Sequence, residues 1–297
     1  MKKQFIKFMI IIVFFLVPIK TNAQVIGPVS YVALGDSLAA GQTPNREIDT
    51  GYSDLIAQEL ARNQPLAFFS KDLAFPGFTS ADVLKRVQSK EAKPLLQSAN
   101  VITISAGAND LLRLIRADER SGSLSFQQIP VDYSLNTVRK NMQTMLSELK
   151  KIAPKAQVYV MGYYYAYPHA RDSQKGGTAE QLDLLNEILA KVAKDAGAQF
   201  VPVAPAFGDS ADKVPNPGDV HPNVEGYRTM ANSFFNVYAK GAMQVMKNEV
   251  PIANPLTFEE IMQAQSESTV TEDKSAVLPS SFLKVEYLAL KEIKPKI

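Results

Sequence analysis

The sequence predicts an α/β protein with a central parallel β-sheet covered by helices. Apolar runs rich in β-branched and aromatic residues alternate with segments whose apolar residues recur at helical spacing. Alternation of this kind is typical of strand–helix–strand units, whose strands pair in parallel. Nearly continuous apolar character further indicates strands buried on both faces. Five segments are expected as strands: Val29–Leu34, Leu66–Phe69, Val101–Ser105, Gln157–Met161 and Gln199–Val203.

Helices are expected between these strands. A Thr178/Gln181 pair has the spacing of a capping box at the start of one of them, and Pro154 follows the end of another. In parallel sheets, ligands bind beyond the carboxyl ends of the strands, so a chemical motif directly after a strand is a candidate site. The expected helices are Tyr52–Arg62, Thr79–Val87, Thr137–Ile152, Ala179–Ala196 and a last one from about Val224 to about Val245.

The chain of 297 residues divides into three expected parts. Residues 1–23 have a basic start, an apolar run over Met9–Pro18 and small residues at Thr21 and Ala23. This pattern predicts a signal peptide cleaved before Gln24 and a secreted protein, with an uncleaved membrane anchor as the alternative. Residues 24–247 form the main domain. Residues 248–297 are interpreted as an extension of unknown role, polar over 266–275 and with a possible strand or packing segment at Phe282–Leu290.

Charge and composition exclude several function classes. The signal peptide holds four of the 32 basic side chains, so the other 28 face 30 acidic ones, a balance that does not suggest a nucleic-acid partner. There is no cysteine, which excludes disulfides, thiolate metal sites and a cysteine nucleophile. With no phosphate-binding loop and no paired-histidine spacing, we expect no cofactor and no metal. Oligomeric state is not predicted.

A serine directly follows the first strand, in Gly35-Asp36-Ser37-Leu38. Such a hydroxyl becomes a nucleophile only with a base to take its proton. The chain has two histidines. His221 precedes Pro222 and Asn223, which favour an extended backbone and a helix cap. His169 follows another strand, with Asp172 available to orient it, but no comparable motif surrounds it. His221 is therefore the expected base, and His169 a loop or pocket-wall residue.

Acyl transfer also needs hydrogen-bond donors for the oxyanion. Gly77, in Phe75-Pro76-Gly77-Phe78, can present a backbone N–H, and Asn109 lies just past the third strand. The plainer alternative is that Gly77 makes a turn and Asn109 caps the next helix.

Taken together, Ser37, Gly77, Asn109 and His221 resemble the four signature residues of the SGNH (GDSL-type) serine hydrolases, in that family's order. The Gly-Asp-Ser-Leu, Gly-x-Asn-Asp and His-Pro-Asn blocks all match, over roughly Ser30 to Met246. The resemblance implies a flavodoxin-like three-layer α/β/α fold and metal-free ester hydrolysis. Ser37 would attack the carbonyl and His221 would move the proton. The oxyanion would be bound by the Ser37 and Gly77 N–H groups and the Asn109 side chain.

One position departs from that family's pattern. The family places an aspartate three residues before the histidine, where this chain has Gly218; Asp219 follows it. We expect Asp219 to complete the triad, and a Ser37–His221 dyad is the alternative. Asp36 is expected to bond loop backbone near Ser37.

Three functional interpretations follow. The first is a secreted esterase or lipase acting on acyl lipids or short acyl esters. The second is a deacetylase of cell-wall or plant polysaccharides, and the third is a non-catalytic surface binding module. No nucleic-acid partner and no stable membrane span after signal cleavage are expected. Tyr163–Tyr167 either lines the substrate pocket or packs on the domain edge, and the phenylalanines at 68, 69, 75 and 78 are expected in the core or pocket wall.

Overall fold

The computed structural model describes residues 27–208 and 211–257, together with residues 260 and 263. The predicted signal peptide (1–23), the polar segment 266–275 and the possible strand at Phe282–Leu290 lie outside the described residues. Within them, no helix combines the length and apolar character that a membrane span requires.

Five parallel strands form the central sheet, in the order β2-β1-β3-β6-β7. The central strand β3 is buried along its whole length, as the sequence pattern predicts for a strand covered on both faces. The strands are β1 (Val29–Gly35), β2 (Leu66–Ala74), β3 (Val101–Ser105), β6 (Gln157–Met161) and β7 (Gln199–Val201).

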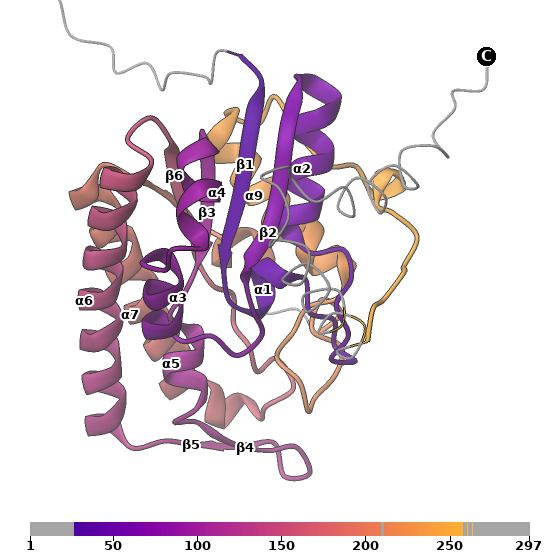
Figure 1. Cartoon of the computed structure of the whole chain (residues 1–297). Coiled ribbons are helices and arrows are strands. Elements are labelled where there is room, and N and C mark those ends of the chain that lie inside the picture. Colours follow the sequence, from indigo (N-terminus) through magenta and orange to yellow (C-terminus); the bar gives the residue numbers. More distant parts are fainter. Residues whose placement is uncertain (1–26, 209–210, 258–259, 261–262, 264–297) are drawn as a thin grey trace, which may run out of the picture.

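Helices cover both faces of this sheet. Figure 1 shows α6 and α7 on one side of the strands and α2 on the other. The first layer packs α2 (Tyr52–Asn63) on α9 (Val224–Tyr238), which also contacts α8 (Ala204–Phe207). The second layer is built around α6 (Gln128–Ile152) and contains α3 (Ser80–Val87), α4 (Ala92–Ser98), α5 (Ala108–Leu112) and α7 (Asp172–Ala196). The predicted three-layer α/β/α fold is confirmed.

Shorter elements lie at the carboxyl ends of the strands. Helix α1 (Ser37–Ala40) follows β1 directly, and an antiparallel hairpin of β4 (Arg116–Asp118) and β5 (Ser123–Ser125) lies at the same end of the molecule (Figure 1). Helices α4, α5 and α8 and this hairpin were not predicted, because segments this short carry too few apolar repeats to give a periodic signal.

Three strand ends differ from the prediction, and the smallest change is in β1, which runs one residue further to Gly35. Strands β3 and β6 have the predicted bounds. Strand β2 continues to Ala74, which pairs with Gly35 of β1, and β7 ends at Val201. The next residue, Pro202, has no N–H to donate to a neighbouring strand.

The two longest helices begin earlier than predicted. Helix α6 starts at Gln128 and tolerates Pro130 because the first turn needs no N–H donor. Helix α7 starts at Asp172 and runs through Gly176 and Gly177. The predicted capping box at Thr178 is therefore wrong. Packing of α7 on α6 and the sheet outweighs the low helix propensity of the glycines.

The last helix is shorter than predicted. It ends at Tyr238, and the chain then reverses through Lys240 and Gly241, both with positive φ (50° and 79°). At its start, the predicted cap is confirmed, since Oδ1 of Asn223 accepts a hydrogen bond from the Gly226 N–H at 3.1 Å.

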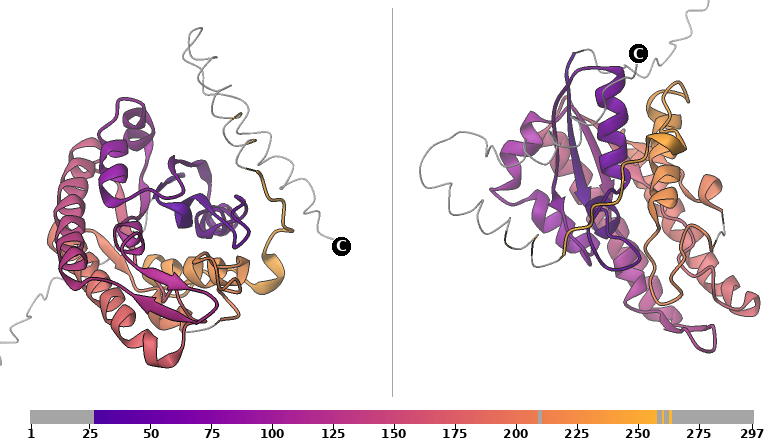
Figure 2. Two further views of the ribbon diagram at one scale, coloured as in Figure 1. Left: turned by 90° about the horizontal axis from the view of Figure 1, so that it is seen from below. Right: turned by 90° about the vertical axis from the view of Figure 1, so that its right-hand side faces the viewer.

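The first residues of the extension pack against the main domain. Glu249, at the end of the 3-10 turn η1 (Lys247–Glu249), pairs with Arg62 at 2.9 Å. Further on, Leu256 and Ile48 exchange backbone hydrogen bonds of 2.7 and 3.1 Å. Figure 2 (right) shows this orange-to-yellow segment running across the N-terminal part of the domain.

Candidate active site

The end of β1 places Ser37 at the carboxyl edge of the sheet. A Cβ on Gly35 would lie 2.2 Å from the Ser105 carbonyl oxygen, and the φ of Gly35 is +141°, so only glycine fits. The turn that follows is fixed by Asp36, whose Oδ1 accepts from the Leu38 N–H at 3.0 Å and caps α1. Ser37 is thereby the first residue of α1 and remains 7% exposed.

His221 bridges Ser37 and Asp219. Nε2 of His221 is 2.7 Å from Oγ of Ser37, and its Nδ1 contacts Oδ1 of Asp219. The same Oδ1 accepts the His221 backbone N–H at 2.8 Å. An imidazole that donates from Nδ1 to the carboxylate presents Nε2 as the acceptor for the serine proton.

Asp219, two residues before His221, reaches the imidazole because the loop turns tightly there. The Asp219 N–H donates to the Asn216 carbonyl at 3.1 Å. Gly218, where the related family has its aspartate, instead faces Glu119, whose carboxylate would lie 2.4 Å from a Cβ at that position.

Electrostatics favour an ionised Asp219. Burial raises the pKa of this carboxyl, but the hydrogen bonds and charge of His221, together with the charge of Arg46, outweigh burial and lower the pKa below its usual value. A carboxylate in this state stabilises a protonated imidazole beside it.

Hydrogen bonds connect the loop of Gly77 to the end of β1 and to Asn109. The Phe75 N–H donates to the Gly35 carbonyl at 3.0 Å, which attaches the Gly77 loop to the end of β1. Nδ2 of Asn109 donates to the Phe78 carbonyl at 2.9 Å. Asn109 lies inside α5, whose N-cap is Gly107, so the alternative in which Asn109 caps that helix is wrong. Gly77 has a φ of +80° and makes a turn.

A buried polar cluster lies beneath Ser37. Asp36 is 1% exposed, and its Oδ2 accepts from the Tyr163 hydroxyl at 2.6 Å while Oδ1 accepts from the Ser105 hydroxyl at 3.0 Å. Burial raises the pKa of Asp36 although these hydrogen bonds oppose it. The predicted role of Asp36 in bonding loop backbone is confirmed, but its pairing with Tyr163 was not predicted.

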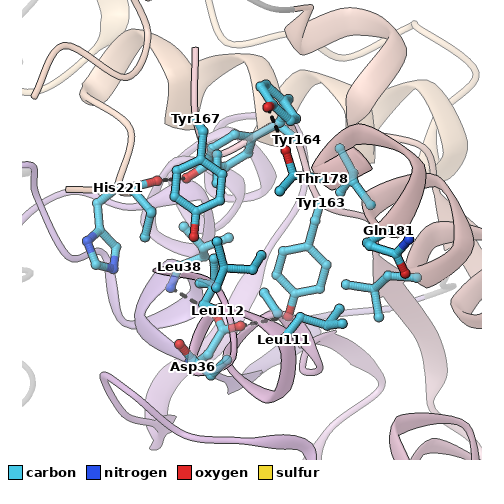
Figure 3. Close-up of a pocket in the computed structure, with 18 of the residues that line it drawn as sticks. Asp36, Leu38, Leu111, Leu112, Tyr163, Tyr164, Tyr167, Thr178, Gln181 and His221 are labelled. Atoms are coloured by element: carbon cyan, nitrogen blue, oxygen red, sulfur yellow. Dashed lines mark hydrogen bonds between the residues drawn. The ribbon is translucent and has the colours of Figure 1, made fainter. Parts of the chain in front are cut away.

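A pocket opens beside Ser37 and extends toward α5 and α7 (Figure 3). It has a volume of about 660 Å³ including its open mouth. The interpretation of the tyrosine segment as pocket lining is confirmed. The phenylalanines at 68, 69, 75 and 78 lie outside the lining, and Phe68, Phe69 and Phe78 pack against the core, which was the other predicted location. The lining comprises Asp36, Ser37 and Leu38; Ala108, Asn109, Leu111, Leu112 and Ile115; Tyr163–Tyr167; Thr178, Gln181, Leu182 and Leu185; and Val220 and His221.

His169 lies apart from this pocket. Its side chain is exposed, and Nε2 contacts the Val214 carbonyl at 2.7 Å. Asp172, which was considered as its orienting group, pairs with Lys175 at 3.1 Å instead. Among the described residues, no group of three or more acidic or histidine side chains has an arrangement that holds a metal ion.

Comparison with known proteins gives remote relatives of the same fold. YpmR of Bacillus subtilis (strain 168), an uncharacterised protein, is 21% identical over 220 residues, covering 70% of this chain and 80% of YpmR. An extracellular lipase from Streptomyces rimosus superposes with a TM-score of 0.53 at 20% identity, over 72% of this chain and all of the lipase. A catalytic mutant of an acetylxylan esterase from Geobacillus stearothermophilus gives 0.52 at 19% identity, over 71% and 94% of the two chains.

The sequence pattern of one family covers most of the main domain, including Ser37, Gly77, Asn109 and His221. Its match spans residues 33–229, from β1 into α9. With the three-layer fold and the meeting of the two motif residues Ser37 and His221 at its sheet edge, this match shows that the chain belongs to the GDSL-like lipase/acylhydrolase family.

Proposed function

We propose that this protein is a secreted carboxylic-ester hydrolase that uses Ser37 as its nucleophile. The observation that carries the proposal is the continuous contact from Asp219 through His221 to Ser37 at the mouth of a pocket. A serine within hydrogen-bond reach of an oriented imidazole is the arrangement that nucleophilic acyl transfer requires.

In the first half-reaction, Oγ of Ser37 attacks the ester carbonyl while Nε2 of His221 takes the hydroxyl proton. The C–O bond to the alcohol then breaks, and the imidazolium returns that proton to the leaving alkoxide, so an acyl-enzyme and a free alcohol remain. Water, deprotonated by the same imidazole, attacks the acyl-enzyme and releases the carboxylic acid and Ser37. Asp219 holds the Nδ1–H and stabilises the imidazolium between these transfers.

The Ser37 and Gly77 N–H groups and the side-chain amide of Asn109 form the oxyanion hole in this proposal. It is supported by the hydrogen bonds that attach the Gly77 loop to Gly35 and to Asn109. The amide of Asn109 carries two N–H donors. One donates to the Phe78 carbonyl, and the other is assigned to the substrate oxygen.

Residues 24–247 constitute the hydrolase domain of this proposal, and residues 1–23 its export signal. Two substrate classes correspond to the neighbours in fold: acyl lipids, as for the Streptomyces lipase, and acetylated polysaccharides, as for the acetylxylan esterase. The third interpretation, a non-catalytic binding module, is disfavoured by the 2.7 Å contact between Ser37 and His221.

The test is hydrolysis of p-nitrophenyl acetate and longer p-nitrophenyl esters by the purified protein, beside Ser37→Ala, His221→Ala and His169→Ala. We expect turnover by the wild type and by His169→Ala, and turnover lowered by roughly 10⁴-fold or more in the other two variants. Inactivity of the folded wild type toward every ester, or full activity of Ser37→Ala, would contradict the proposal.

A further inference from the structure

The part of the pocket away from His221 is walled by apolar side chains from two helices. Helix α5 contributes Leu111 and Leu112, Ile115 lies just beyond its end, and α7 contributes Leu182 and Leu185. In Figure 3, His221 lies at one side of the pocket and Gln181 at the other, with Leu38, Leu111 and Leu112 between them. An extended chain attached at Ser37 would therefore run along these side chains toward α7.

Several polar groups of the lining are already engaged by the protein. Both oxygens of Asp36 accept hydrogen bonds, and the Tyr164 hydroxyl donates to the Val220 carbonyl at 2.7 Å. Oγ1 of Thr178 and the Tyr165 hydroxyl pair at 2.8 Å. A sugar ring in this part of the pocket would lose hydrogen bonds to water with few replacements, which is unfavourable. A hydrocarbon chain has no hydrogen bonds to lose, and its burial against apolar side chains is favourable.

The α7 side of the pocket includes two buried polar side chains. Thr178 and Gln181 are each 4% exposed, and with Leu185 they recur at the spacing of one helix face. Oε1 of Gln181 also accepts a long hydrogen bond of 3.4 Å from Gln128 at the start of α6. Thr178 belongs to this helical wall because α7 begins at Asp172, ahead of the predicted start.

We propose that this pocket binds the linear acyl chain of the ester and that the α7 wall, through Leu182 and its neighbours, sets the longest chain accepted. The inference rests on the proposed function and goes further by naming the substrate: an ester of a medium-length unbranched acid, preferred over an acetate. The leucines of α5 and α7 in the lining offer apolar surface beyond what an acetyl methyl group can cover. Each further methylene that enters the apolar part increases binding by about fourfold.

The kinetic test compares p-nitrophenyl esters of increasing acyl length, which share one leaving group. For the wild type, kcat/KM is expected to rise by about fourfold per methylene from the acetate to an optimum and then to level off or fall. Leu182→Trp should lower kcat/KM for the longest accepted chains by at least about tenfold, since overfilling an apolar pocket is unfavourable. It should lower kcat/KM for the acetate much less than for the long chains, because the acetyl group does not extend to α7.

Leu184→Trp is the matched control, on the same helix but 37% exposed and outside the lining. It should reproduce the wild-type profile. Leu182→Ala, which deepens the pocket, should move the optimum to longer chains and serves if the tryptophan variant does not fold. The inference would be overturned if the wild type had its highest kcat/KM with the acetate. It would also be overturned if the variants at Leu182 changed kcat/KM by the same factor for every chain length.

A binding measurement separates this inference from the proposed function. The chain contains no tryptophan, so Leu182→Trp introduces a single fluorophore at the pocket wall. In a Ser37→Ala background, a brominated fatty acid shorter than the wild-type optimum, which ends before the tryptophan, should quench this fluorescence, and Leu184→Trp should not respond. Quenching without turnover in the wild type would contradict only the hydrolase proposal. Turnover without selective quenching would overturn only the acyl site.

Discussion

The guanidinium of Arg46 lies beside the carboxylate that contacts His221, with Nε of Arg46 3.6 Å from Oδ2 of Asp219. Arg46 adopts a left-handed backbone conformation, with φ at 64°, in the loop between α1 and α2. Hydrogen bonds from Tyr227 to the Gln42 carbonyl (2.6 Å) and from Asn216 to the Pro44 carbonyl (2.9 Å) hold this loop. An anchored loop that holds a cation beside the carboxylate proposed for the triad suggests that Arg46 has a positioning role.

Arg46→Ala should reduce kcat by at most about fivefold, because the Arg46 side chain is 77% exposed and surface ion pairs of this kind contribute about 0.2–1 kcal/mol. Loss of the charge raises the pKa of Asp219, so Asp219 becomes protonated at a higher pH. The decline of kcat toward acidic pH should therefore begin at a higher pH than in the wild type.

The measurement is a pH profile of kcat at low and at high salt. Arg46→Lys should restore part of the effect, and about 1 M salt should diminish it through screening. Arg120→Ala, on the exposed turn of the β4–β5 hairpin, is the control. A tenfold or larger loss of kcat in Arg46→Ala would mean that the guanidinium contacts the substrate instead.

The extension is expected to support this same loop. Pro in place of Leu256 removes the N–H that donates to the Ile48 carbonyl at 2.7 Å, one of the two hydrogen bonds of that bridge. The loop should then hold Arg46 less firmly, and kcat should fall by a factor similar to that of Arg46→Ala. Because both changes act through one contact, the double variant should be no less active than Arg46→Ala alone.

Steady-state kinetics of the two single variants and the double variant test this coupling. Ile252→Pro, at a position that is 93% exposed in the same segment, should behave as the wild type. Strictly multiplicative losses in the double variant would show that the bridge and Arg46 act independently.

Loss of the Asn109 amide should be more severe. Asn109→Ala removes one of the three donors assigned to the oxyanion, and such losses lower kcat by roughly 100- to 1000-fold. KM should change little, because the donor acts mainly on the transition state. Asn109→Asp keeps the size of the side chain but replaces the donors by a charge, and it should not recover activity.

Steady-state kinetics and a thermal melt distinguish this role from support of the Gly77 loop, since Asn109 also bonds the Phe78 carbonyl. A kcat reduction of less than tenfold would contradict the assignment to the oxyanion hole. So would a fall in melting temperature large enough to leave the variant unfolded under the assay conditions.

The sequence predicted what depends on local pattern and missed what depends on distant contacts. Buried strands such as β3 carry a continuous apolar signal, and motifs that follow strand ends are brought to one edge by the parallel sheet. The start of α7 was missed because Gly176 and Gly177 weaken the helical signal. In the fold, packing of α7 against other elements compensates for the low helix propensity of these glycines. The Tyr163–Asp36 bond joins residues 127 positions apart, which no local spacing indicates. Arg46 is one exposed arginine among others until the fold places it beside Asp219.

The buried Asp36–Tyr163 pair leads to a prediction about stability. Tyr163→Phe leaves Oδ2 of Asp36 without its hydroxyl donor in an environment where Asp36 is 1% exposed. An unsatisfied buried acceptor reduces the free energy of unfolding by about 1–3 kcal/mol, and more when the acceptor is charged. We expect a loss in the upper part of this range at pH 7.

The loss should depend on pH in a defined direction. Burial raises the pKa of Asp36 in the folded protein, and the Tyr163 hydroxyl lowers it in part. Removing that hydroxyl raises the folded-state pKa further while the unfolded value stays the same. The deficit is then fully present at neutral pH, where Asp36 is charged, and it shrinks as the pH falls through the folded-state pKa and the carboxyl becomes neutral.

Urea unfolding of the wild type and of Tyr163→Phe across this pH range measures the deficit. Tyr164→Phe is the matched control, because the neighbouring tyrosine is also buried but donates to the neutral Val220 carbonyl at 2.7 Å. Its deficit should be about 0.5–1.5 kcal/mol and independent of pH, since no titrating group accepts the bond. A deficit in Tyr163→Phe that stays constant with pH would show that Asp36 is already neutral in the folded protein. The carboxyl beneath Ser37 would then contribute no charge to the site.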